Sequence, residues 1–471
     1  MKKIVLLALA LLLAFTMISC TEEETVSVDT LQVGFGRESI HPTESVPLAG
    51  FGNTSTRFSK LTLDMLKSTC VAFKSGDDLC LLYTNDLINS SKAWSTPIIE
   101  EISGKTGVPT ERIFFTATHT HSAPDVTSTE PVMEGYREFL KTQMVKAAEE
   151  AIADLAPATL YGSKIETEGL NFIRHYTIAD GTVAGDNFGS YSAGITGHAG
   201  ENDPEMIVLK AEREGKKKDI ILVNWQAHPK QTGTGAQLNI SADYVAPFRE
   251  NVEAFADAHC AFFLGAAGNE NPTSYKSGET RTSDFTIHGS LLAQYALSAL
   301  ENLEKIEGKG IEFESLTATE EYTQEKIDLY DKAVKVVDRW YSSGVKSKGE
   351  ALAKKYGFVS VYEASAIKAR TERIQRNELS GDITYYATRI GDFAFICAPY
   401  EMFAESGRFI KDNSPFKYTF INSCATDSLS YFALESAYEY NAYESFNSRF
   451  TKGIAERSAD RFVELLKKLH E

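Results

Sequence analysis

Short apolar runs alternate with amphipathic stretches along most of this chain. The apolar runs predict strands at 31 to 36, 68 to 85, 113 to 118, 159 to 164, 206 to 212, 219 to 225, 262 to 266 and 393 to 397. Helical periodicity predicts helices at 93 to 105, 135 to 155, 289 to 304 and 455 to 469. A further helix should open near Ser241, because Pro247 then falls within its first turns. Strands alternating with helices predict an α/β fold, with a mixed β-sheet core flanked by helices.

Residues 320 to 378 differ from the rest in composition. They are rich in Lys, Glu, Ala and Tyr, with apolar positions at helical spacing such as Tyr330, Ala333, Val337 and Trp340. We expect a helical insertion here. It is either a lid over a site or a plain helical hairpin packed on the sheet, and we favour the hairpin.

Two histidines lie two residues apart at the end of a predicted strand. The run Ile113 to Ala117 is apolar, and His119 and His121 follow it just before a loop. Residues two apart on a strand point the same way, so both imidazoles should project together. Such a pair suits a metal or a proton relay. The alternative is that the two rings only hydrogen-bond within a turn.

Other polar groups also follow predicted strands. His228 comes after the run at 220 to 223, and Glu401 follows the run at 393 to 397. Ligands at the ends of separate strands are what a metal site at one edge of a sheet requires. The loop Gly265 to Pro272 is rich in small residues that let a backbone approach a substrate, although a tight loop needs no function.

The first 20 residues predict an export signal. Lys2 and Lys3 precede an apolar stretch too short to span a membrane, and Met17 to Cys20 is similar to a bacterial lipobox. We expect Cys20 to be acylated, with 21 to 30 as a linker and the protein anchored at the outer membrane or cell surface. An ordinary secretory signal is the alternative.

Charge and cysteine content exclude some classes. The net charge of −17 becomes −19 without Lys2 and Lys3, and basic stripes are absent from the sequence, so nucleic acid is not an expected partner. The five cysteines beyond Cys20 are an odd number, which argues against a disulfide framework. Cys70 and Cys80 lie in neighbouring runs and could pair, but most of the five should be small core residues.

The motifs together resemble the neutral ceramidases, zinc amidases that split ceramide into sphingosine and fatty acid. Thr118 to Pro124 reads T-H-T-H-S-A-P, which is similar to the family motif T-H-T-H-S-G-P. Further similarities, in the same order along the chain, cover 31 to 471 and include Val33 to Gly36, Asn224 to Pro229, Ser241 to Asp243, Pro399 to Glu401 and the tyrosine-rich block 428 to 450. This range is expected to hold the catalytic domain without the family's C-terminal β-sandwich.

The resemblance implies roles for individual residues. It places the ligands of a Zn²⁺ ion on His119, His228, Glu401 and Tyr431, with Tyr431 the weakest. It makes His121 a group that supports the metal ligands or handles protons, Arg174 the group that polarises the substrate, and Tyr443 a residue that helps hold the carbonyl oxygen.

One departure from the family concerns the nucleophile. The family loop G-D-x-S-P-N has a serine where this chain has Asn271, and Ser274 is off register. A zinc ion lowers the pKa of its water from about 15.7 toward about 7, so hydrolysis needs no serine. We therefore expect Asn271 or Glu270 to assist, with Glu270 and Asn269 contacting the substrate.

These expectations define one function and its alternatives. The chain is expected to be a zinc-dependent hydrolase that cleaves the N-acyl bond of a ceramide-like lipid. The alternatives are a deacylase or esterase acting on another substrate, such as a glycan or small amide, and a non-catalytic binding lipoprotein.

Overall fold

The computed structural model describes residues 30 to 51, 57 to 233, 237 to 343 and 345 to 471. The export signal, Cys20 and most of the expected linker lie outside these residues. Within them, no helix combines the length and apolar character needed to cross a membrane.

The largest sheet has nine strands, eight of them in one continuous path. In spatial order these are β14 (His259–Leu264), β12 (Ile220–Trp225), β11 (Glu205–Arg213), β6 (Ala156–Glu166), β1 (Gln32–Ser39), β3 (Lys67–Ser75), β4 (Asp78–Asn85) and β5 (Ile113–Ala117), with β16 (Glu304–Lys305) beside β6. The two halves of the path join through only two residue pairs between β1 and β6. The β4–β5 and β12–β14 pairs are parallel and the other neighbours are antiparallel.

A second sheet of four strands packs on one face of the first. Its order is β17 (Ile311–Glu321), β18 (Ser380–Ile390), β19 (Phe393–Cys397) and β21 (Tyr418–Asn422), with β19 and β21 parallel. The core between the sheets joins Phe73 and Phe114 of the large sheet to Phe395 and Phe420 of the small one.

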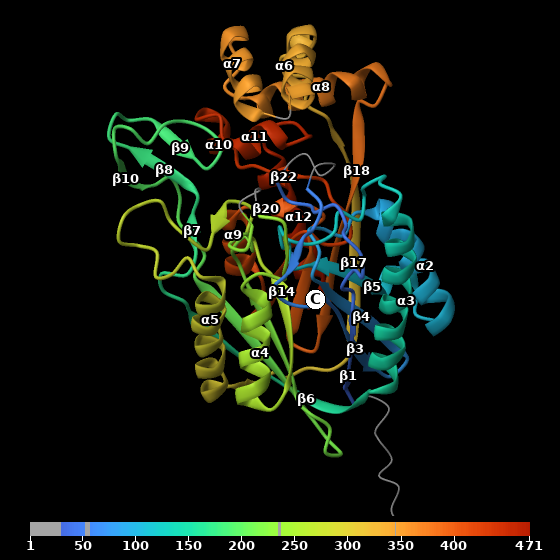
Figure 1. Ribbon diagram of the computed structural model, residues 1–471. Coiled ribbons are helices and arrows are strands. Elements are labelled where there is room, and N and C mark those ends of the chain that lie inside the picture. Colours follow the sequence, from blue (N-terminus) through green and yellow to red (C-terminus); the bar gives the residue numbers. More distant parts are fainter. Residues whose placement is uncertain (1–29, 52–56, 234–236, 344) are drawn as a thin grey trace, which may run out of the picture.

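Helices cover the two outer faces. On the large sheet lie α2 (Lys92–Thr106), α3 (Val132–Ala153), α4 (Val245–Ala256) and α5 (Phe285–Ala299), and on the small sheet α9 (Ala404–Asn413) and α12 (Ile454–His470). In Figure 1 α2 and α3 lie at the right and α4 and α5 at the left of the view, and residues of all four belong to one core on the large sheet. The molecule is therefore a four-layer α/β sandwich, and the expected mixed sheet flanked by helices is confirmed.

Two glycines of β1 set the distance between α3 and the sheet. A Cβ at Gly34 would lie 1.9 Å from the carbonyl oxygen of Ala151, and one at Gly36 would lie 2.1 Å from that of Ala147. The backbone of α3 therefore packs directly on β1, which only glycine allows.

Cys70 and Cys80, which the sequence left as a possible pair, do not form a disulfide. All five cysteines in the described part of the chain are free and buried. Cys70 lies opposite Tyr83 and Cys80 opposite Phe73, and the two side chains enter cores on opposite faces of the sheet. Sulfur atoms on opposite faces cannot bond.

The insertion between β17 and β18 consists of a short 3₁₀ turn (Ile327–Leu329), α6 (Tyr330–Ser343), α7 (Lys346–Tyr356) and α8 (Val361–Gln375). Its helices have their own small core, which includes Val336, Phe358 and Ile367. Figure 1 shows them as a separate layer at the top, beyond the end of β18. The insertion is therefore not the favoured plain hairpin packed on the sheet.

Short elements complete the fold beside the sandwich. A small sheet has the order β10 (Ile195–His198), β8 (His175–Ile178) and β9 (Val183–Gly185), and three two-residue pairs join β13 (Asn239–Ile240) to β2 (Leu61–Thr62), β15 (Glu270–Asn271) to β7 (Phe172–Ile173), and β20 (Glu401–Met402) to β22 (Tyr431–Phe432). The remaining turns of helix are η2 (Thr110–Arg112), η3 (Leu300–Asn302), α10 (Glu435–Glu439) and α11 (Tyr443–Asn447).

Candidate active site

Three parallel strand pairs end at one place in the molecule. His119 and His121 follow β5, His228 follows β12, and Glu401 follows β19. Because strands in a parallel pair run in the same direction, the loops that leave them emerge at the same edge of each sheet. The two packed sheets thus bring residues from distant parts of the chain into one cluster.

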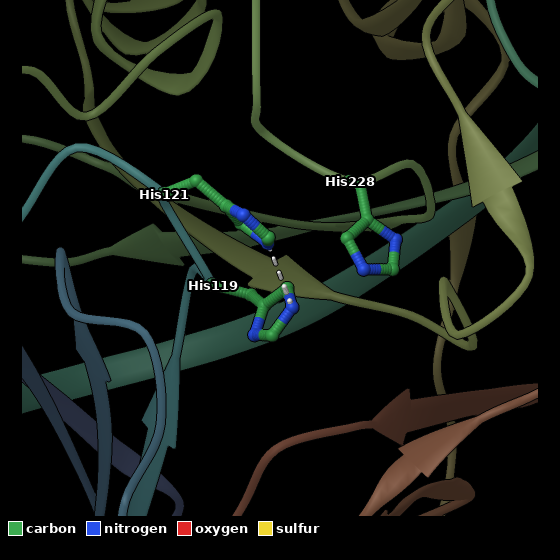
Figure 2. Close-up of side chains that lie close together, drawn as sticks. All are labelled: His119, His121 and His228. Atoms are coloured by element: carbon green, nitrogen blue, oxygen red, sulfur yellow. Dashed lines mark hydrogen bonds between the residues drawn. The ribbon is translucent and has the colours of Figure 1, made fainter. Parts of the chain in front are cut away.

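Three imidazoles and one carboxylate make up this cluster. The Nε2 atoms of His119 and His121 are 3.3 Å apart. Glu401 Oε2 lies 3.3 Å from His119 Nε2 and 3.2 Å from His228 Nε2. All three histidines are buried, with ligand atoms within 4.8 Å of one another. Figure 2 shows the three rings gathered in one place, with a hydrogen bond joining His119 and His121.

Backbone carbonyls orient two of the rings. His119 Nδ1 lies 2.6 Å from the carbonyl oxygen of Ile88, and His228 Nδ1 lies 2.7 Å from that of Ala267. A carbonyl oxygen only accepts, so each Nδ1 carries the proton and donates it. In the neutral rings both Nε2 atoms then present lone pairs to the Glu401 carboxylate, as in metal sites where a second partner fixes the tautomer.

The electrostatics of the cluster favour a bound cation. Burial, together with nearby Arg174, lowers the pKa of His228 to about 4, so this ring is neutral at pH 7 and its lone pair faces a carboxylate oxygen. Burial alone would raise the pKa of Glu401, but His119 and His228 hold it well below its ordinary value. Two acceptors facing each other require a positive charge between them.

The pKa of His119 also indicates that this position favours a positive charge. Burial opposes its protonation, yet Cys424 and Glu401 raise its pKa well above the ordinary value. The distances fit a metal as well, since donor atoms about 2.0–2.1 Å from one tetrahedral ion lie roughly 3.3 Å apart. The nitrogen and oxygen donors of His119, His228 and Glu401 therefore fit Zn²⁺.

His121 lies within the cluster itself, with its Nε2 3.3 Å from that of His119. Its Nε2 is among the converging nitrogen atoms, while its buried Nδ1 has no hydrogen-bond partner in the described structure. Burial and the two neighbouring histidines lower its pKa well below the ordinary value. His121 could therefore act either as a third nitrogen ligand of a metal ion or as a proton acceptor beside it.

A cavity of about 620 Å³ opens onto the cluster. The expected residues His119, His121, Glu401, Arg174, Tyr431 and Tyr443 all line it. Three further aromatic rings line it, those of Phe51, Tyr275 and Tyr362, and most of the other lining residues are polar or small. Tyr362 belongs to α8 and contacts Tyr443, with 5.0 Å between ring centroids, so the helical insertion supplies part of the wall.

Arg174 is held rigidly in this wall. Its Nε donates to Glu444 Oε1 at 2.7 Å, and one terminal nitrogen lies 3.3 Å from the Tyr431 hydroxyl. Glu444 Oε2 also accepts from His175 Nε2 at 3.0 Å. Although burial opposes its charge, Arg174 and His175 lower the pKa of Glu444 to about 2, so the carboxylate stays ionised. The guanidinium is thereby fixed beside the tyrosine.

Tyr431 lies next to Glu401 in the β20–β22 pair, which brings its ring to the cavity. Burial, reinforced by Glu401, raises the pKa of Tyr431 well above its ordinary value. The phenol is therefore neutral.

Three of the expected site residues lie behind the cavity wall. Asn269, Glu270 and Asn271 are at most 3% exposed and are not among the lining residues. Glu270 accepts from the Asp203 backbone at 2.6 Å, and Asn269 bonds Glu405 at 2.9 Å. Their side chains support the loop, which differs from the expected contact with substrate.

The side chain of Asn271, for which a catalytic role was expected, is not among those that line the cavity. Its Nδ2 donates to Asp186 Oδ2 at 2.7 Å, and Asp186 lines the cavity. Lys230 Nζ lies 2.5 Å from the same oxygen atom. Sequence reasoning missed Asp186, Lys230 and Glu444, although Lys230 stands two residues after His228 and Glu444 directly follows Tyr443.

Comparisons with known proteins support the fold of this chain. No protein-family model and no curated protein matches this sequence. A solved structure described as "Ceramidase complexed with C2" is 16% identical, with a TM-score of 0.68 over 94% of this chain and 75% of that one. The neutral ceramidase from Pseudomonas aeruginosa is 16% identical, with a TM-score of 0.67 over 94% of this chain and 74% of that one. The chain therefore has the fold of these structures.

Proposed function

We propose that this chain is a zinc-dependent hydrolase of the neutral ceramidase family that cleaves an N-acyl bond. The observation that carries the proposal is the cluster of His119, His228 and Glu401, of which His119 and Glu401 line the cavity. There, the Nε2 atoms of both histidines lie 3.2–3.3 Å from one carboxylate oxygen of Glu401. The shared fold with two ceramidase structures supports the same reading.

Zn²⁺ would be held by His119, His228 and Glu401, with Tyr431 as a weak neutral donor and His121 at the same centre. Bound there, zinc would supply Lewis acidity and bring the pKa of a water molecule toward about 7. The hydrogen bonds from His119 and His228 to backbone carbonyls fix the orientation of both rings and would keep them directed at a bound ion.

Arg174, Tyr431 and Tyr443 would bind the carbonyl oxygen of the substrate. Arg174 is charged and fixed by Glu444, and both phenols are neutral because burial raises the pKa of each hydroxyl. Preorganised donors of this kind stabilise the oxyanion as it forms, each by about 3 kcal/mol. These three side chains are on the wall of the same cavity.

His121 would move the proton. In its neutral form one ring nitrogen accepts a proton from the attacking water, and the imidazolium can return it to the leaving amine. We propose water as the nucleophile, because Asn271, at the position of the family's serine, is turned to Asp186 and away from the cavity lining.

A ceramide-like lipid is the leading substrate, since the aromatic wall suits an apolar chain beside the amide. An amide or ester of a more polar compound is the second candidate, and the charged residues Lys230 and Asp186 on the same wall favour it. A binding lipoprotein without activity is the third.

A hydrolysis screen tests the proposal. The zinc-loaded protein would be assayed against ceramides, N-acyl amino acids and acetylated sugars, next to His119→Ala and His228→Ala. We expect at least one class to be cleaved and both variants to be inactive. Ligand binding that survives in both variants, without turnover of any class by the unaltered protein, would identify a binding protein.

We also propose that Cys20 carries a lipid that anchors the protein to the outer membrane or cell surface. Expression of Cys20→Ser tests this, because the variant should move from the membrane fraction to the soluble fraction. An unchanged distribution would contradict the lipid anchor.

A further inference from the structure

A second cavity lies between the helical insertion and α11. Its volume is about 310 Å³, and its lining includes Glu363, Ile367 and Arg370 of α8 together with Ser445 and Phe446 of α11. Figure 1 shows α11 below the insertion, and α8 and α11 contact each other. Among the described residues, none that lines this cavity also lines the catalytic one. We term it the α8–α11 cavity, and the chemistry proposed above makes no use of it.

Arg370 is a buried cation in the lining of this cavity. It is 6% exposed and forms no ion pair with a carboxylate of the described chain. Its terminal nitrogens donate instead to the backbone carbonyl oxygens of Glu325 at 2.9 Å and Phe446 at 3.4 Å. Burial lowers the pKa of Arg370, and the nearby carboxylates of Glu325 and Glu363 offset this only in part. Arginine is rarely buried so fully without a paired carboxylate, so the position favours an anionic ligand.

The other charged groups of the lining are either paired with each other or exposed. Lys326 and Glu363 form an ion pair. Lys452 is exposed, and Glu325 and Glu439 are exposed as well, so that water screens their charges. The cations and carboxylates of the lining therefore cancel formally, but the buried charge that has no ion-pair partner in the described chain is the positive one of the arginine.

The lining also defines the kind of anion. A guanidinium has five N–H groups, so the two bonds of Arg370 to backbone carbonyls leave donors for a ligand. A planar carboxylate fits such donors because it accepts two parallel hydrogen bonds. Ile367 and Phe446 add apolar surface to the same cavity. The α8–α11 cavity thus suits a carboxylate on a short apolar chain.

Both helices of this cavity also reach the catalytic one. Tyr362 of α8 and Tyr443 of α11 line the catalytic cavity, with 5.0 Å between their ring centroids. Glu444, which holds Arg174 in place, directly precedes Ser445 in the lining of the α8–α11 cavity. A ligand held between α8 and α11 would therefore act on the segment that positions the proposed oxyanion donors.

We propose that the α8–α11 cavity binds a small carboxylate, and that the bound ligand speeds hydrolysis by holding α11 against α8. The effect on rate rests on the proposed hydrolase function, whereas the binding does not. Two sources share this chemistry, the acid that hydrolysis of an N-acyl bond releases and free short acids of the surroundings such as acetate.

Calorimetry on the full-length protein tests the binding. Hexanoate, acetate and 1-hexanol are the probes, and each is titrated with and without added zinc. Arg370→Gln removes the buried charge, and Lys452→Met, at an exposed side chain, serves if Arg370→Gln does not fold. Arg373→Gln is the matched control, because Arg373 lies on the same helix, forms no ion pair within the described chain and is outside the cavity lining.

We expect hexanoate to bind the unaltered protein equally well with and without zinc, and 1-hexanol to bind at least about tenfold more weakly, because it lacks the charge that pairs with a guanidinium. Arg370→Gln should lower the affinity for hexanoate about tenfold or more and Lys452→Met about threefold, whereas Arg373→Gln should leave it unchanged. Hexanoate affinity well above that of acetate would indicate the acyl product as the source, and equal affinities would indicate free short acids. Binding that needs zinc, or that is unchanged in Arg370→Gln and Lys452→Met, would lie elsewhere and would overturn the proposal.

Steady-state kinetics on the cleaved amide test the effect on rate. Saturating hexanoate should raise kcat about twofold or more in the unaltered enzyme and in Arg373→Gln, but not in Arg370→Gln. Binding without any change in kcat, or inhibition that is equal in all three proteins, would overturn the regulatory role.

The two proposals can fail separately. If no amide is cleaved but hexanoate binds in a manner that depends on Arg370, the hydrolase proposal fails and the carboxylate site stands. If an amide is cleaved but hexanoate does not bind, the carboxylate site fails and the hydrolase stands.

Discussion

Glu444→Gln separates the positioning of Arg174 from general stability. The two side chains are 5% and 1% exposed, and the Arg174 Nε to Glu444 Oε1 distance is 2.7 Å. Glutamine keeps the shape and one acceptor oxygen but removes the charge that neutralises the guanidinium. Breaking a buried ion pair from one side costs about 3–5 kcal/mol, so we expect the free energy of unfolding to fall by about 3 kcal/mol.

The same substitution should slow the reaction. A freed Arg174 no longer points at the carbonyl oxygen, and an oxyanion donor is worth about 3 kcal/mol, or roughly 100-fold in kcat. Glu320→Gln is the matched control, because Glu320 also bridges two cations, Arg457 at 2.8 Å and Arg461 at 2.5 Å, outside the cavity lining.

Urea unfolding and steady-state kinetics on the cleaved amide would compare the two variants. Both should lose stability, but only Glu444→Gln should lose kcat, with little change in KM. If Glu320→Gln lost as much kcat as Glu444→Gln, the loss would come from weakened folding, and the positioning role would be refuted.

Three further predictions follow from single residues. Gly50 has a φ of 104°, and a Cβ there would lie 2.7 Å from His121. Gly50→Ala should therefore weaken zinc binding about tenfold, as measured by competition with a chelator. An unchanged zinc affinity would contradict the packing argument. Tyr362→Ala should lower kcat/KM about fivefold, mainly through a higher KM, because it removes the aromatic ring that lines the cavity beside Tyr443. Unchanged kinetics would show that the helical insertion does not take part in the site. His288 is fully buried without hydrogen-bond partners among the described residues, and burial lowers its pKa to about 3. Below pH 6.5 the imidazole of His288 is protonated in the unfolded chain but stays neutral in the folded protein. The free energy of unfolding should therefore fall by about 1.4 kcal/mol for each unit by which the pH is lowered from roughly pH 6 to pH 4. His288→Leu should lose this component in urea titrations at several pH values, and an equal pH dependence in the two proteins would contradict it.

The proposed histidine and glutamate ligands could be placed from the sequence because each comes within a few residues of the end of an apolar run. His119, His228 and Glu401 stand at the ends of β5, β12 and β19, so a local pattern was enough to predict where each lies in its own strand. Their convergence depends on the packing of two sheets. The α/β class was also predictable, because the strand and helix periods differ along the chain.

Other features depend on contacts between distant residues. Asp186, which directly follows β9, meets Lys230 across 44 residues of chain, and nothing in the residues around Asp186 indicates this contact. The sequence suggested a disulfide from the closeness of Cys70 and Cys80, but the strand register puts them on opposite faces. Asn271 was expected in the site from its motif position, yet its side chain turns to Asp186.

The direct test of the central claim is the identity and position of a bound metal. Zinc titration of the metal-free protein with X-ray absorption at the zinc edge would give the stoichiometry and the ligands. We predict one zinc per chain, bound by at least two imidazole nitrogens and one carboxylate oxygen, and lost in His119→Ala, His228→Ala and Glu401→Gln. A protein that binds no zinc, or binds it equally well in these three variants, would contradict the account.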